Sequence, residues 1–190
     1  MKKYLIALAA VFCLAGTSQA ASILWSVGNG AIKSFTVSGE TITEGTANLA
    51  DANLYFILRT LSSEDVASAF TTSGFTTPKS VTLLDQAVST KGGSKSAGST
   101  PITNSGISAD SATPFSLVIA SQLDSEWYYK VINKEGTGYD ETNPQNPSVT
   151  LTFTANEVKS ASWTHAAVPE PSVALMGLLG IGMLIRRRKA

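Results

Sequence analysis

Residues 115–133 read FSLVIASQL, then DS, then EWYYKVIN, so that two apolar segments flank the pair Asp124-Ser125. Large side chains recur at every second position in each segment: Phe115, Leu117 and Ile119 in the first, and Trp127, Tyr129 and Val131 in the second. Successive side chains of a strand point to opposite faces of its sheet. This period of two therefore predicts two strands, 115–123 and 126–133, in a domain rich in β-structure.

Strand signals also precede this pair. Residues 22–28 alternate and are followed by Asn29-Gly30, a strong hairpin signal. We expect an N-terminal β-meander that continues through 31–38 and turns again at Gly39. Residues 53–61 are apolar almost throughout, which indicates a strand buried on both faces.

The chain after residue 147 carries two further strand predictions. Residues 149–154 (VTLTFT) alternate between apolar residues and threonine, which predicts a strand with threonines outside. Asn156 to Lys159 interrupt the pattern, and a last strand is expected at 160–166 around Trp163. Residues 166–168 are expected to be a linker.

One short helix is expected after the strand at 53–61. Ser62 is a good N-cap, Glu64 and Asp65 place acids in the first turn, and the Thr/Ser run from residue 71 ends the helix. Residues 81–90 fit a strand or a helix equally well. Residues 91–114 and 134–147 are rich in polar residues, Gly and Pro, which predicts two mobile loops.

These elements favour one mainly antiparallel, sandwich-like domain at 21–167, with one short helix. A partly open barrel or the edge of a β-solenoid is the alternative. The domain carries eight basic and 13 acidic residues, a net charge near −5, although the whole chain is neutral. An acidic domain of this kind argues against a nucleic-acid partner.

The first 20 residues have the three parts of a secretory signal peptide: Lys2-Lys3, an apolar run, and small residues that end at Ala20. Cleavage is expected between Ala20 and Ala21, with signal peptidase and the Sec export machinery as partners. Cys13 is the sole cysteine and lies in the apolar run, so the mature chain is expected to lack thiols and disulfides.

The last 23 residues have three parts as well. Val168 and Pro169-Glu170-Pro171 come first, then 14 uncharged residues at 172–185, then Arg186, Arg187, Arg188 and Lys189. A helix over 172–185 would be about 21 Å long, short for a bilayer core of about 30 Å, but local thinning and snorkelling can cover the difference. The basic cluster should stay on the cytoplasmic side, which predicts a transmembrane helix with its N-terminal end outside.

This end resembles the sorting tail of PEP-CTERM proteins of Gram-negative bacteria, the presumed substrates of membrane-embedded exosortases. The resemblance covers about residues 168–190 and implies recognition at Pro169, Glu170 and Pro171, then removal of the tail. It implies transient residence in the inner membrane and delivery to the cell surface, extracellular matrix or extracellular polysaccharide. The two prolines hold the motif extended, as a protease requires of its substrate.

Signals for catalysis are sparse. His165 is the only histidine and is expected to be solvated, since a catalytic triad or a zinc site needs partners for it. A glycosidase needs only two carboxylates, for which Asp124 with Glu126 or Asp140 with Glu141 are the candidates. Acidic residues at strand ends are more often solvated turn residues.

Two further groups of residues are candidate binding sites. Residues of the second loop supply oxygen ligands for calcium without the EF-hand spacing: Asn133, Glu135, Asp140, Glu141 and Asn143. Tyr128 lies on the opposite face from Trp127 and Tyr129, so it is a candidate ligand contact if that face is solvated, and it packs under a loop otherwise. No metal or cofactor is expected.

Three functions follow for the exported protein. The first is a non-enzymatic surface or extracellular-matrix protein with a processed tail. The second is a secreted carbohydrate-active hydrolase with a carboxylate pair. The third is a surface protein anchored permanently by its C-terminal helix.

Overall fold

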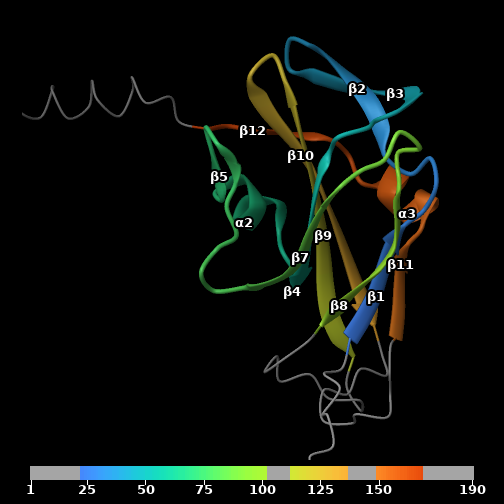
Figure 1. Ribbon diagram of the computed structural model, residues 1–190. Coiled ribbons are helices and arrows are strands. Elements are labelled where there is room, and N and C mark those ends of the chain that lie inside the picture. The colour runs from blue at the N-terminus through green and yellow to red at the C-terminus, as the bar shows by residue number, and fades with distance from the viewer. Residues whose placement is uncertain (1–21, 102–111, 137–148, 169–190) are drawn as a thin grey trace, which may run out of the picture.

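The computed structural model describes residues 22–101, 112–136 and 149–168 (Figure 1). The predicted signal peptide, its cleavage site and the sorting tail lie outside these ranges. The described chain is mainly β, with two short helices. Twelve strands are assigned in it: β1 Ser22–Val27, β2 Lys33–Ser38, β3 Thr41–Asn48, β4 Asn53–Leu58, β5 Phe70–Thr71, β6 Gly74–Phe75, β7 Thr82–Val88, β8 Lys95–Pro101, β9 Thr113–Leu123, β10 Glu126–Gly136, β11 Val149–Phe153 and β12 Thr164–Ala166.

A five-stranded sheet, in the order β12-β10-β9-β4-β7, is built around the hairpin of β9 and β10. The predicted strand pair is confirmed, and both strands are longer than expected, at 11 residues each. Asp124 and Ser125 join them with φ angles of 51° and 69°. Positive φ at both central residues is the mark of a type I′ turn, which matches the twist of the hairpin.

The second main sheet has three strands in the order β11-β1-β8. Apolar side chains of this sheet and of the five-stranded sheet share one buried cluster, which includes Trp25, Phe56, Phe115 and Phe153. The aromatic rings of Trp25 and Phe56 stack with centroids 5.0 Å apart, and they come from opposite sheets. This cluster is the core of the protein.

A second buried cluster lies on the other face of the five-stranded sheet. Helix α2 (Ser63–Ala67) and the small hairpin of β5 and β6 cover it with Val66, Phe70 and Phe75. Because β4 and β9 contribute to both clusters, they are buried on both faces, and the strand predicted at 53–61 is confirmed over Asn53–Leu58, although Arg59 and Thr60 lie beyond it and are exposed. Figure 1 shows α2 and β5 on one side of β9 and β10, with β1 and β11 on the other.

Local helix signals are confirmed where they were recognised. Ser62 caps α2, since its hydroxyl accepts the backbone N–H of Asp65 and the Asp65 carboxylate accepts the Ser62 N–H in return. The second helix, α3 (Ala155–Ser160), was not predicted. Its capping box of Thr154 and Glu157 stands in the sequence as T-x-x-E, but the segment is short and the sequence pattern predicts only a break between strands there.

The expected N-terminal meander is wrong at its first turn. Gly30 has a φ of 65°, as the Asn-Gly signal predicts, but β1 does not pair with β2. Instead β1 pairs in parallel with β11 and antiparallel with β8. Both hydrogen-bonding edges of β1 are thus occupied, and β2 forms its own hairpin with β3 through the predicted turn at Gly39, whose φ is 60°.

The two loop predictions also need correction. Residues 95–101, expected to be loop, form the edge strand β8, and residues 113–114 and 134–136 belong to β9 and β10. Low apolar content misled the prediction because an edge strand is held by backbone hydrogen bonds on one side and need not bury large side chains. The undecided segment at 81–90 is the strand β7.

Candidate functional site

The last described residues bind to the open edge of the five-stranded sheet. β12 pairs antiparallel with β10, with Trp127 opposite Ala166, Tyr128 opposite His165 and Tyr129 opposite Thr164. Ala166 is buried in the second cluster, and Val168 packs against the same cluster. The expected linker at 166–168 is therefore part of the fold, up to the residue before Pro169.

His165 has two partners on β10. Its Nε2 lies 3.3 Å from the Oε2 of Glu126, and its ring centroid lies 5.2 Å from that of Tyr128. The side chains of His165 and Glu126 are 45% and 60% exposed. The prediction that His165 is solvated is confirmed by this exposure, and its ring in addition lies against β10.

Tyr128 is buried, with 4% of its surface exposed. Its ring packs against Phe35, with centroids 5.0 Å apart, and its hydroxyl donates to the Oε2 of Glu126 at 3.1 Å. Burial, and then the hydrogen bond to this carboxylate, raise the pKa of the Tyr128 hydroxyl. Of the two alternatives for Tyr128, the structure excludes the solvated ligand contact, and the ring packs in the core beside β2 where a covering loop was the other expectation.

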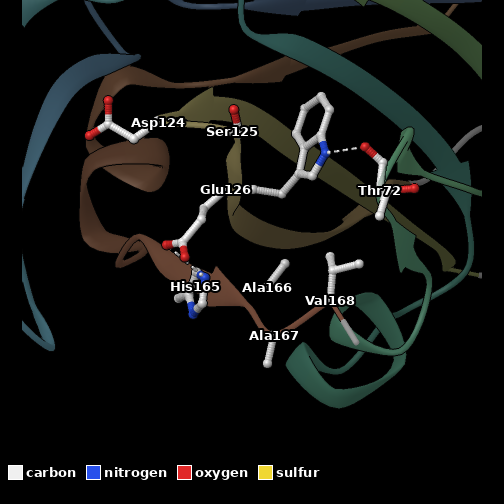
Figure 2. A pocket seen from close by; sticks show the side chains of 9 residues that line it. Thr72, Asp124, Ser125, Glu126, His165, Ala166, Ala167 and Val168 are labelled. Carbon is white, nitrogen blue, oxygen red and sulfur yellow. Dashed lines mark hydrogen bonds and ion pairs between the residues drawn. The ribbon is translucent and has the colours of Figure 1, made fainter. Parts of the chain in front are cut away.

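Two open hollows meet at the Glu126–His165 pair. The larger has a volume of about 450 Å³ and is lined by Thr72, residues 124–127 and residues 165–168. The smaller, about 330 Å³, lies between the same pair and the β2–β3 turn. Figure 2 shows the Glu126 and His165 side chains directed toward each other, with Asp124 and Ser125 on the neighbouring turn.

The wall of the larger hollow is set by close packing. Gly74 has a φ of 112°, and a β-carbon there would lie 3.0 Å from the Trp127 ring. The glycine therefore allows the β5–β6 hairpin to lie against Trp127, whose indole N–H donates to the Thr72 carbonyl at 3.4 Å (Figure 2). Of the predicted carboxylates, Asp124 and Glu126 line this hollow together.

The remaining predicted sites are not assembled within the described residues. Asn133 is engaged by the fold, since its amide donates to the Leu61 carbonyl at 2.9 Å and accepts from the Ser116 hydroxyl at 2.5 Å. In the ranges that the structure describes, no group of three or more His, Cys, Asp or Glu residues is placed to hold a metal ion. These predicted residues lie outside those ranges: Ala20, Ala21, Asp140, Glu141, Asn143, Pro169, Glu170, Pro171, Arg186, Arg187, Arg188 and Lys189.

The predicted membrane helix at 172–185 also falls outside the described residues. Among the helices that are described, none has the length and apolar character needed to cross a bilayer.

Sequence reasoning missed a buried cation. Lys130 on β10 is fully buried and forms an ion pair with Glu44 of β3. Its Nζ also donates to the Val158 carbonyl of α3 at 3.3 Å and lies 5.4 Å from the centre of the Trp163 ring. The sequence does hold a signal for this burial. Lys130 lies two residues from both Tyr128 and Ile132, so the three side chains share one face of β10, and a lysine between two large apolar residues on one face indicates a buried cation.

Comparison with known proteins gives no relative: no protein-family model, curated protein or solved structure matches the chain.

Proposed function

We propose that this protein is an exported, non-enzymatic component of the cell surface or extracellular matrix. Its described strands would form one sandwich-like domain, and its C-terminal tail would direct processing by an exosortase-type enzyme in the inner membrane. The tail sequence carries the proposal: a Pro-Glu-Pro motif, a 14-residue uncharged run and four terminal cations stand together in residues 169–190, and a signal peptide opens the chain.

The geometry of the residues before the tail supports separate roles for the domain and the tail. The described residues run to Val168, which packs against the second cluster and stands one residue before the motif. In the larger hollow, the Oε2 of Glu126 is engaged by the Tyr128 hydroxyl and approached by His165. The contact with His165 joins β10 to β12, which suits a carboxylate that holds two strands together.

The test compares the intact mass and location of the exported protein with those of a P169A/E170A/P171A variant in the native host. The wild-type protein should lose everything after about residue 171 and leave the membrane fraction. The variant should keep Arg186 to Lys189 and remain in the inner membrane. A P78A variant, altered in a described loop far from the motif along the sequence, serves as the control for substitution of proline.

Two results would contradict the proposal. A mature wild-type protein that keeps its basic end in the membrane would indicate a permanent anchor instead of a sorting tail. Processing of the triple variant at the wild-type rate would remove the motif from the mechanism.

A further inference from the structure

We propose that β12 is a releasable clasp, meaning the segment Thr164–Ala166 together with its contacts to β10, and that it must detach before the tail is processed. The proposal rests on the proposed function and adds a regulatory step to it. The rate of processing would then depend on the stability of β12 on the sheet as well as on the motif itself.

The first argument is distance. Ala166 is the last residue paired with β10, and Pro169 follows three residues later. Three residues span at most about 11 Å when fully extended. A protein of this size has a radius of gyration of about 13 Å or more. With β12 in place, an enzyme that lies in the membrane would meet the folded domain before it could enclose an extended segment on both sides of the motif.

The second argument is the backbone of the exit segment. Proteases that read a motif bind their substrate as an extended strand, and strand pairing of this kind uses the backbone hydrogen bonds of the peptide. On the side of residues 164–166 that faces β10, the backbone hydrogen-bonding groups belong to the β10 pairing, and the Val168 N–H donates to the Ala166 carbonyl at 2.8 Å. Val168 is also packed against the second cluster. While β12 stays on the sheet, an enzyme therefore cannot surround the residues just before the motif, because their inner edge faces β10 and Val168 is packed.

The third argument is that detaching β12 from the sheet should cost little free energy. It is three residues long, lies at the sheet edge, and exposes Thr164 and His165. Short edge elements with few buried contacts open at a small fraction of the global unfolding free energy. The strand β10 behind it keeps its full pairing with β9 along 11 residues, so the domain would remain folded while the clasp is open.

The side-chain contacts identify what holds the clasp closed. Ala166 and Val168 are its apolar anchors, and the contact of His165 with Glu126 and Tyr128 fixes its middle. These same contacts separate the two hollows described above. Release of β12 would therefore merge the hollows and uncover the edge of β10 at residues 127–129.

The test locks the clasp reversibly. Because Cys13 lies in the predicted signal peptide, a Y128C/H165C variant would carry the only two thiols of the mature chain, at positions directly opposite each other in the β10–β12 register. We expect processing of the oxidised protein to be slower than that of the same variant reduced with dithiothreitol by on the order of tenfold or more. Oxidised and reduced forms share both substitutions, so any effect of truncating Tyr128 cancels.

A second variant tests whether the short distance between β12 and the motif is what limits processing. Insertion of eight Gly and Ser residues between Val168 and Pro169, in the same double-cysteine background, places the motif well beyond the clasp. Oxidised and reduced forms should then be processed at equal rates. Hydrogen exchange provides an independent readout, and the amides of residues 164–166 should exchange faster than those in the middle of β9.

Each outcome decides one of the two proposals. Equal processing of the locked and reduced proteins without the insertion, while P169A/E170A/P171A still blocks processing, would overturn the clasp and leave the sorting function standing. A locked protein that stays slow after the insertion would also overturn the clasp, because reach would not be the limit. Unimpaired processing of the P169A/E170A/P171A variant would overturn the sorting function itself.

Discussion

Lys130 joins three elements through one charged group. Its ammonium contacts Glu44 on β3, the Val158 carbonyl at the end of α3 and the face of Trp163, while the lysine itself is wholly buried on β10. Glu44 keeps 30% of its side chain exposed. The two members of the pair are therefore unequal, since the carboxylate can reach water without its partner and the ammonium cannot.

This inequality predicts different costs for removing each partner. Glu44→Ala strands a buried ammonium and should lower the free energy of unfolding by about 3 kcal/mol, the lower end of the range for a broken buried pair. Lys130→Met keeps much of the packing and leaves a carboxylate that water can solvate, so it should cost about 1 kcal/mol or less. Urea denaturation measures both, with Glu40→Gln on the same hairpin as the control. A larger cost for Lys130→Met would refute this account.

The turn of the β9–β10 hairpin places two non-glycine residues at positive φ angles. Asp124 tolerates a positive φ better than most residues, because its short side chain bonds locally, but Ser125 is strained at a φ of 69°. Glycine is the usual residue at that second position of a type I′ turn. The hairpin forms nonetheless, because 11 residue pairs and burial on both faces outweigh one unfavourable dihedral angle.

Ser125→Gly should therefore stabilise the protein by about 0.5–1 kcal/mol, the cost of the left-handed conformation that glycine avoids. Thermal and urea unfolding would both report the gain. Ser125→Ala, which keeps the β-carbon, should bring no gain, and a stabilisation equal to that of glycine would show that the turn strain is not the cause.

In the molecule as a whole, hydrogen bonds to Asp85 join the two main sheets. We call these bonds the polar bridge, and the line along which β7 meets the three-stranded sheet the seam. Asp85 on β7 accepts the indole N–H of Trp25 at 2.7 Å and the hydroxyl of Thr100 at 3.1 Å, and both donors come from the three-stranded sheet. Lys95 lies over the Trp25 ring, 3.8 Å from its centre. Burial lowers the pKa of the Lys95 ammonium, while the Asp85 carboxylate opposes that shift.

The bridge predicts a chemical distinction at position 85. Asp85→Ala leaves the fully buried Trp25 N–H without an acceptor and should cost about 1–3 kcal/mol in urea unfolding. Asp85→Asn keeps an acceptor oxygen and should cost clearly less. Equal losses in the two variants would mean that the carboxylate charge, and not the hydrogen bond to Trp25, holds the seam together.

Features that depend on neighbouring residues could be predicted from the sequence. The period-two rows around Asp124 and Ser125, the turn at Gly39 and the cap at Ser62 are local, because steric limits on φ and short hydrogen bonds act within a few residues. The same reasoning failed for β8 and α3, where the local signals were weak or short. The sequence also determined the acidic charge of the domain and the three-part pattern of the tail.

Only the tertiary structure decided which strand edges meet. β1 lies between β8 and β11, and Lys130 contacts Glu44, which is 86 residues away in the sequence. β12 pairs with β10 and so places His165 opposite Tyr128. A strand has two edges and can satisfy them with any compatible strand, so pairing is chosen by burial over the whole fold and not by spacing along the chain. That choice placed residues 166–168, expected to be a linker, in the fold: Ala166 ends β12 and Val168 packs against the second cluster.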